Sequence, residues 1–174
     1  MATTNLISVQ EYLNTSYRPD CDYVDGEVQE RNVGEFDHAL LQTLIAGHFL
    51  ARSAEWKVVP VVEQRVQVAA TRFRIPDVTV LRSSQPREQI ITAAPLIVVE
   101  VLSKDDSLRT MQEKIDDYLN FGVQNIWILD PALRRAYVCS RTGFQEPEGG
   151  VLTVAGSHIR LVLTELFDEA ARAL

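Results

Sequence analysis

The segment Leu96–Leu102 constrains the fold more than any other part of the chain. Its sequence is apolar and rich in β-branched residues except at Glu100, and it lies between Pro95 and the polar run Ser103–Asp106. A short apolar run with such boundaries is typical of a central strand covered on both faces. A carboxylate inside that strand is costly unless a partner, a metal ion or a hydrogen-bond network holds it. The sequence therefore predicts a polar site built around Glu100.

The length and composition predict a single globular domain over residues 1–174. With 174 residues, 46% of them apolar, the chain can bury one good core and has no room for a second. No apolar stretch reaches the length of a membrane span, and residues 1–5 lack the basic start of a signal peptide. We therefore expect a cytoplasmic protein with no membrane partner.

The N-terminal part of the chain carries two local structural signals. A capping box over Ser8–Glu11 predicts a short helix that ends at about Asn14. The pair Asp25-Gly26 suits a type I′ turn and predicts a β-hairpin over residues 22–29. The fold should therefore begin with a helix and a hairpin.

The rest of the chain alternates between helical and strand-like segments. Amphipathic helices are predicted over about 38–52 and from about 106 to 121, with a last helix capped by Thr164. Strands are predicted at 57–68, 73–81, 96–102, 125–129, 135–140, 151–154 and 159–161. Pro60 should lie at a sheet edge, a bulge or a strand start, and residues 141–150 should form a loop. This order predicts an α/β fold with a central mixed β-sheet flanked by helices.

The distribution of charge bears on nucleic-acid binding. The net charge of −7 argues against a protein that holds nucleic acid by a general basic field. Only three of the 17 basic residues are lysines, and several arginines cluster in the middle of the chain. These are Arg65, Arg72, Arg74, Arg82 and Arg87. They form either a local phosphate-facing patch, with Arg65, Arg72 and Arg74 as DNA contacts, or separate solvated side chains.

Two carboxylates and one lysine make up the candidate chemistry. Asp77 stands near the start of one predicted strand and Glu100 within the next, so adjacent strands can bring them together. Carboxylates held close repel each other unless a cation joins them, and hard oxygen ligands suit Mg²⁺ or Mn²⁺. Lys114 lies two turns into the helix after Glu100 and reaches the pair if that helix packs back across the sheet. There it would orient a water or neutralise charge beside a phosphoryl oxygen.

With these residues in place, the chain resembles the Uma-two family of proposed restriction endonucleases, a branch of the PD-(D/E)xK nuclease superfamily. The resemblance covers nearly the whole chain and is carried by short motifs. These are Tyr23–Glu27, His38, Ile75–Val78, Val99–Ser103, Lys114 with Tyr118, Gly122-Val123 and Trp127–Pro131. The resemblance implies a restriction-endonuclease-like core in which Asp77 and Glu100 bind a divalent metal ion, with the backbone carbonyl of Val101 as a candidate third ligand.

One position departs from the superfamily pattern. The pattern places a lysine two residues after the second acid, where this chain has Leu102. Either the site is inactive, or the role of the lysine has moved to Lys114 on the next helix, which is the interpretation that we favour. Lys104, on the loop after the strand, is a second candidate for that role.

The motifs also contain two accessory candidates. Glu27 is either an accessory metal ligand or a residue on the polar face of the hairpin. His38 is either a base or ligand, or simply the residue that begins a helix. Tyr118 and Trp127 are expected to contribute only to packing.

The sequence thus predicts a Mg²⁺- or Mn²⁺-dependent endonuclease that hydrolyses DNA. A homodimer is expected because two subunits can each cut one strand. Two alternatives stay open. The first is a catalytically inactive binding module with a nuclease fold, which is favoured by Leu102 at the lysine position and by the acidic net charge. The second is a metal-dependent hydrolase of a smaller phosphoester, which would use the same site without a DNA groove.

Overall fold

A mixed six-stranded sheet forms the centre of this computed structural model, which describes residues 6–31 and 35–173. The expectation that residues 1–5 do not begin a signal peptide lies outside the described residues. The strand order is β10-β9-β8-β7-β6-β3. The strands are β3 (Val58–Val62), β6 (Val78–Arg82), β7 (Ile97–Val101), β8 (Asn125–Asp130), β9 (Arg135–Ser140) and β10 (Gly143–Gln145). Because β7 and β8 are parallel and the other neighbours are antiparallel, the predicted mixed sheet is confirmed.

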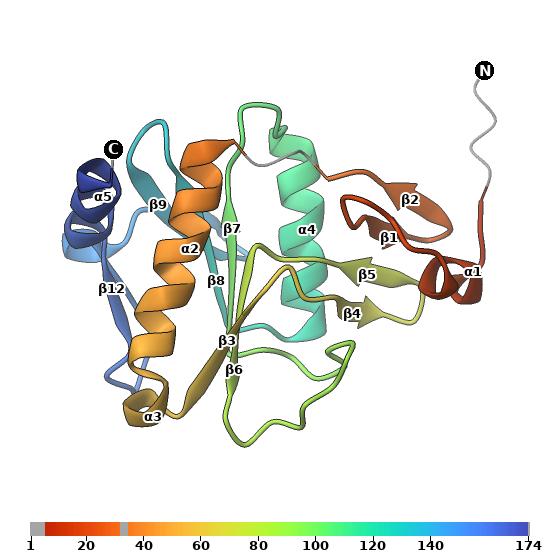
Figure 1. Ribbon diagram of the computed structural model, residues 1–174, viewed down its shortest axis with the longest axis horizontal. Coiled ribbons are helices and arrows are strands. Elements are labelled where there is room, and N and C mark those ends of the chain that lie inside the picture. Colours follow the sequence, from red (N-terminus) through yellow and green to blue (C-terminus); the bar gives the residue numbers. More distant parts are fainter. Residues whose placement is uncertain (1–5, 32–34, 174) are drawn as a thin grey trace.

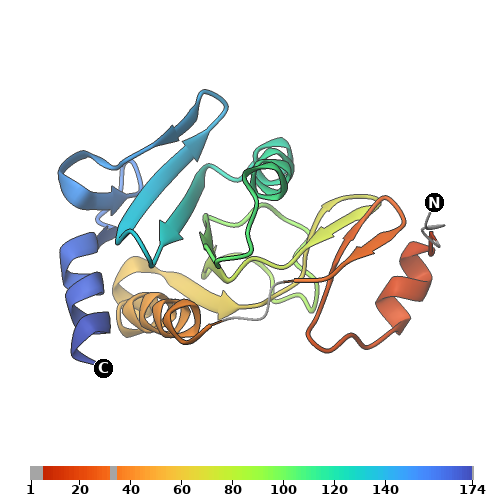
Figure 2. The same cartoon turned by 90° about the horizontal axis from the view of Figure 1, so that it is seen from above.

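Helices cover both faces of this sheet. The helices α2 (Phe36–Ala51) and α5 (Leu163–Arg172) pack on one face and α4 (Leu108–Phe121) packs on the other (Figure 1). Seen from above, α2 and α4 lie on opposite sides of the strands (Figure 2). Every residue of β7 is buried, and its side chains alternate between the two apolar clusters, as predicted for a central strand. None of the described helices is long and apolar enough to cross a membrane.

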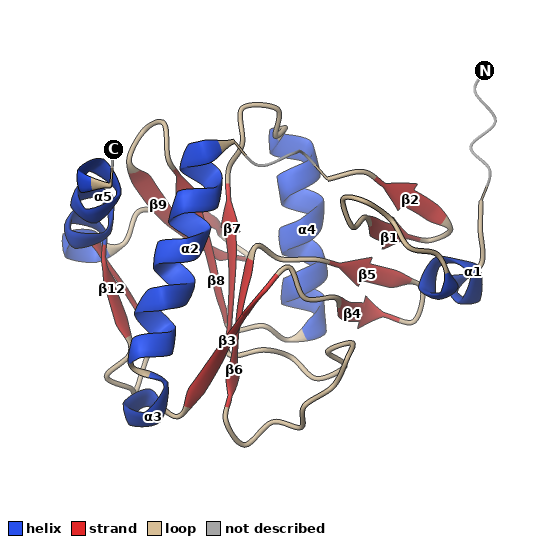
Figure 3. Cartoon of the chain, viewed as in Figure 1, coloured by secondary structure: helices blue, strands red, loops and turns tan. Residues whose placement is uncertain are grey.

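A smaller antiparallel sheet, in the order β2-β1-β5-β4, extends from the α4 side of the molecule together with α1 (Figure 3). Its elements are α1 (Val9–Asn14), β1 (Asp22–Val24), β2 (Glu27–Gln29), β4 (Val66–Ala69) and β5 (Arg72–Arg74). The Oγ atom of Ser8 accepts a hydrogen bond from the backbone N–H of Glu11 at 3.1 Å, which confirms the predicted N-cap. Asp25 and Gly26 both have positive φ angles, as the predicted hairpin turn requires.

Two segments predicted as single strands are each divided between the two sheets. Residues 57–68 contain β3 and β4, separated at Glu63, whose φ angle of 49° turns the chain. Residues 73–81 contain β5 and β6, with Pro76 between them. Apolar residues resume within a few positions of both breaks, so each segment has the composition of one continuous strand. Pro60 lies in β3, the edge strand of the central sheet, as expected.

The remaining elements lie near the ends of α2 and α5. They are α3 (Ser53–Trp56), the 3-10 turn η1 (Glu148–Gly150), β11 (Val151–Thr153) and β12 (Arg160–Val162), of which the last two form a hairpin sheet. Two C-terminal predictions are wrong. Residues 141–150 contain β10, which extends the central sheet, and α5 begins at Leu163 because the apolar face of the helix starts there, so Thr164 lies inside the helix.

Two glycines, one at the end of a helix and one inside a helix, give predictions for the free energy of unfolding. Gly122 ends α4 with a φ angle of 101°, so Gly122→Ala should lower the free energy of unfolding by about 1 kcal/mol. Gly47 lies inside α2, and an added Cβ there would meet no atom within 4 Å. Gly47→Ala should therefore raise the free energy of unfolding by about 0.5–1 kcal/mol. Urea denaturation measures both changes, and a stabilising Gly122→Ala would contradict the assigned end of α4.

Candidate metal and phosphate site

Asp77 and Glu100 face each other at one end of the central sheet. The pairing of Val78 with Val99 continues by one residue to place Asp77 opposite Glu100. Both carboxylates are buried, with exposed fractions of 3% and 2%. The Oδ2 atom of Asp77 accepts a hydrogen bond of 2.7 Å from the backbone N–H of Val101. The start of β6 is thereby tied to the end of β7, and the two predicted acids are brought together.

Glu100 is held by two side chains of α4. Lys114 Nζ lies 3.3 Å from Glu100 Oε2, and the hydroxyl of Tyr118 donates a 2.5 Å hydrogen bond to Glu100 Oε1. Lys114 and Tyr118 are four residues apart, which places them on the same face of the helix. The structure therefore brings Lys114 to the acids, as expected from the sequence. The expectation that Tyr118 contributes only packing is wrong, because its hydroxyl binds the carboxylate.

Asp77 is held by residues at the start of α2 and just before it. Arg31 Nη2 lies 2.9 Å from Asp77 Oδ1, and His38 Nε2 lies 3.2 Å from Asp77 Oδ2. Gln42, one turn after His38, donates a 3.1 Å hydrogen bond to the backbone oxygen of Asp77. Arg31 and Gln42 were not predicted as site residues. Gln42 has the same helical spacing from His38 that Tyr118 has from Lys114, whereas no sequence pattern marks Arg31.

The environment affects the two carboxylates differently. Burial raises the pKa of Glu100 to about 7, with a further contribution from the charge of Asp77, although Lys114 opposes the shift. Burial also disfavours ionisation of Asp77, but the hydrogen bond and charge of His38 hold the pKa of Asp77 below its ordinary value. Lys114 is partly buried, which disfavours its charged form, yet the charge of Glu100 raises its pKa, so Lys114 stays protonated. Near neutral pH Glu100 is poised to gain or lose a proton, and the hydrogen bond to Asp77 raises the pKa of His38 toward the same range.

The acidic pair has acceptor positions to spare for a cation. An ionised carboxylate offers about four lone-pair positions, of which Asp77 uses three in hydrogen bonds and Glu100 uses two. The described residues contain no group of three or more His, Cys, Asp or Glu side chains arranged around a metal position. An ion held by these two carboxylates would therefore complete its shell with backbone carbonyls and water, as Mg²⁺ commonly does. The residues present fit such an ion.

Three other candidates are not brought to the acidic pair. Glu27 is exposed on β2, and nothing in the described part of the chain hydrogen-bonds it to Asp77 or Glu100. Lys104 is exposed and forms an ion pair of 2.6 Å with Glu35. Leu102, at the position of the expected lysine, packs in the apolar cluster beneath α4. Of the two lysines considered, only Lys114 contacts an acid of the site.

The arginine group does not form the expected DNA-binding patch. Arg74 is 1% exposed, and its guanidinium binds Asp117 at 2.6 Å and Asp22 at 3.1 Å. Arg72 also binds Asp117, at 2.8 Å, and Arg65 is ion-paired with a nearby aspartate. The expectation that Arg74 contacts DNA is therefore corrected. Its guanidinium is buried and joins the smaller sheet to α4 through these two aspartates. Arg65 and Arg72 are likewise engaged within the protein, while the other two arginines of the group are exposed.

The buried ion pair between Arg74 and Asp117 gives a stability prediction. Asp117→Asn leaves the Arg74 charge without its closest partner and should cost about 3–5 kcal/mol of the free energy of unfolding. Glu113→Gln is the control on the same helix, because its ion pair with Arg109 is exposed and should contribute less than about 0.5 kcal/mol. Urea denaturation of both variants tests this, and similar losses for the two would contradict it.

Comparisons with known proteins agree with this picture of the fold. The Uma2 family, described as "Putative restriction endonuclease", matches residues 9–159. A crystal structure from Anabaena variabilis ATCC 29413, described as a "putative nuclease belonging to DUF820", superposes with a TM-score of 0.82 and 21% sequence identity, covering 94% of this chain and 99% of that chain. No curated protein matches. At this identity the likeness establishes the fold alone, and it confirms the nuclease-type α/β fold expected from the sequence.

Proposed function

The chain belongs to the Uma2 family, and from this premise we propose that it is a metal-dependent nuclease whose active site is the pair Asp77 and Glu100. The observation that carries the proposal is the convergence of two buried carboxylates with a protonated lysine, Lys114, 3.3 Å from one of them. Two acids that can hold a divalent ion and one fixed positive charge are groups that can accelerate hydrolysis of a phosphodiester. The nuclease description of the structural neighbour supports the same reaction class.

Each side chain has a distinct role in this proposal. A divalent ion bound there would lower the pKa of its water and stabilise charge on the phosphate. Asp77 and Glu100 would hold that ion, with the carbonyl of Val101 as a third oxygen. Tyr118 fixes one oxygen of Glu100 by its hydrogen bond and leaves the carboxylate a single orientation. Because Lys114 stays protonated, it acts as a positive charge beside the phosphoryl oxygens rather than as a base.

We propose DNA as the substrate and a homodimer as the working form. The family description names restriction endonucleases, which act on DNA, and two copies of one site can cut the two strands of a duplex. Within each copy, His38 and Arg31 balance the charge of Asp77 in the absence of a metal ion. Both side chains are partly buried against Asp77 and would offer positive charge to a phosphate.

One observation favours a second candidate function, a binding module without catalysis. The superfamily lysine position is occupied by Leu102, which is packed against apolar neighbours and cannot supply a charge. A third candidate, a hydrolase of a smaller phosphoester, would keep the acidic pair and Lys114. Plasmid cleavage separates these functions, since only the nuclease requires both the acids and a DNA substrate.

The cleavage prediction compares two lysines. With Mg²⁺ or Mn²⁺ the protein should nick or linearise supercoiled DNA, and Asp77→Ala or Glu100→Ala should abolish the cut. Lys114→Met should slow cleavage by about 100-fold or more, because a fixed charge at the phosphate is lost. Lys104→Met should cleave within about twofold of wild type, because its ammonium group is paired with Glu35 at the surface. Cleavage lost in Lys104→Met and kept in Lys114→Met would contradict the assignment.

The raised pKa of Glu100 predicts how metal binding depends on pH. A cation and a proton compete for this carboxylate, whose pKa in the metal-free protein is about 7. The affinity for Mn²⁺ should therefore be constant well above pH 7 and fall by about tenfold per pH unit below it, as one proton is displaced. Calorimetric titration between pH 5.5 and about 8.5 measures this slope. An affinity that does not change across this range would rule out Glu100 as a ligand.

A further inference from the structure

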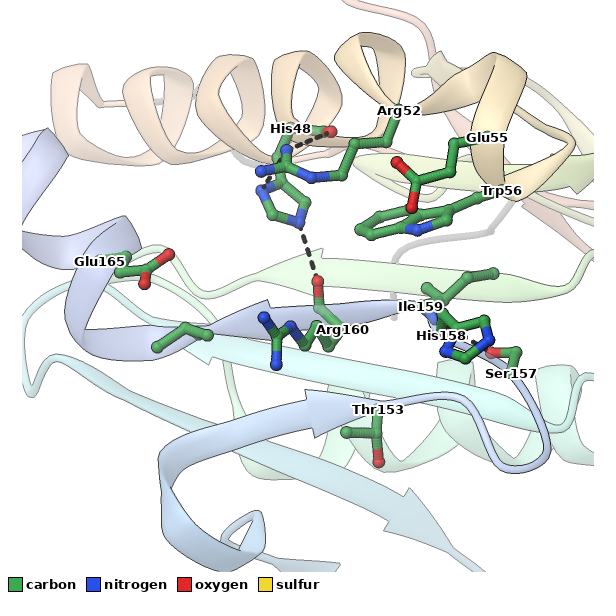
Figure 4. Close-up of a pocket in the computed structure, with 11 residues that line it drawn as sticks. His48, Arg52, Glu55, Trp56, Thr153, Ser157, His158, Ile159, Arg160 and Glu165 are labelled. Carbon is green, nitrogen blue, oxygen red and sulfur yellow. Dashed lines mark hydrogen bonds between the residues drawn. The ribbon is translucent and has the colours of Figure 1, made fainter.

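A polar hollow lies at the other end of α2 from the acidic pair. It has a volume of about 580 Å³ and is bounded by the end of α2, by α3 and by the β11–β12 hairpin (Figure 4). His48 and Trp56 form one wall, and Arg160, His158 and Thr153 come from the hairpin on the other side. None of these residues takes part in the acidic site, so the hollow requires its own explanation.

The wall formed by the helices is held in place by His48. Its Nε2 atom lies 2.8 Å from the backbone oxygen of Arg160, and its Nδ1 atom lies 3.2 Å from Nη1 of Arg52. A ring nitrogen that accepts from Arg52 carries no proton, so the neutral imidazole with its proton on Nε2 satisfies both contacts. Burial lowers the pKa of His48, in agreement with the neutral form. His48 therefore joins α2 to the hairpin and keeps the hollow open between them.

Trp56 offers an aromatic surface in this wall. The guanidinium of Arg52 lies 5.4 Å from the centre of the Trp56 ring, and the ring of His48 lies 5.5 Å from it. These contacts fix the indole at the boundary of the hollow, where it remains partly exposed. A rigid, partly exposed tryptophan is the type of surface on which a nucleic-acid base stacks.

The opposite wall carries unused hydrogen-bond donors. Within the described part of the chain, the side chains of Arg160 and His158 have no hydrogen-bond or ion-pair partner, and both line the hollow. Guanidinium and imidazole groups together are well suited to a phosphate. Glu55 and Glu165 also line the hollow and bring its net charge close to zero. This balance suits a ligand group that carries one phosphate and also an amino group.

We propose that this hollow binds one nucleotide, with the phosphate held by Arg160 and His158 and the base stacked on Trp56. Glu55, next to Trp56, would accept a hydrogen bond from an exocyclic amino group of the base. The choice of a nucleotide rests on the proposed nuclease function. His38 and His48 are about 15 Å apart along α2, which corresponds to the rise of about four base pairs of duplex DNA. The hollow would thus hold a substrate strand a few nucleotides away from the bond to be cut.

Tryptophan fluorescence tests this proposal directly. The chain has two tryptophans, and Trp127 is fully buried, so a ligand in the hollow should quench only Trp56. Deoxyadenosine monophosphate, added without divalent ions, should give saturable quenching and a matching calorimetric heat. Arg160→Ala should weaken binding about tenfold by removing a charge-assisted hydrogen bond, and deoxyadenosine without its phosphate should bind as weakly to wild type.

Three comparisons decide the outcome. Arg109→Ala removes an exposed arginine from α4 and should bind deoxyadenosine monophosphate as wild type does. Asp77→Asn should also bind normally, which separates this site from the nuclease site, because cleavage is not part of the measurement. The proposal would be overturned by the absence of both quenching and heat, by equal affinities for Arg160→Ala and Arg109→Ala, or by loss of binding in Asp77→Asn.

Discussion

The burial of two carboxylates side by side is the constraint on which the rest of the structure depends. Such a pair is costly in an apolar interior unless other groups bind it. The groups that do so come from separate parts of the chain: Arg31 precedes α2, His38 lies in its first turn, and Lys114 and Tyr118 come from α4. These contacts tie α2 and α4 to the same end of the sheet, and a shift of either helix would leave a buried charge without its partner.

The smaller sheet is also held in place by buried charges that bind each other. Arg74 is buried between Asp22 of the hairpin and Asp117 of α4, and Asp117 directly precedes Tyr118, which binds Glu100. Ion pairs of this kind add little net stability over apolar packing, but they are costly to break. They hold α4 against the smaller sheet at Asp117, the residue next to Tyr118. The arginines predicted to meet DNA serve the fold instead.

The strands, helices and central acids could be predicted because each has a local signal. Glu100 interrupts an apolar run, Asp77 precedes a strand, and Lys114 has the helical spacing that reaches them. Partners that are distant in sequence carry no such signal. Arg74 lies 52 residues from Asp22 and 43 from Asp117, so its burial could not be predicted from its neighbours. The role of Tyr118 follows from its spacing to Lys114, whereas that of Arg31 depends on how the chain enters α2.

The central claim is that the buried carboxylates of Asp77 and Glu100 share one divalent cation. Crystals soaked in Mn²⁺ and measured at the manganese absorption edge test it most directly, because anomalous density locates the ion without assumption. The account predicts one peak in contact with both carboxylates, with Lys114 still beside Glu100. A structure with full manganese peaks elsewhere and none between these two side chains would contradict it.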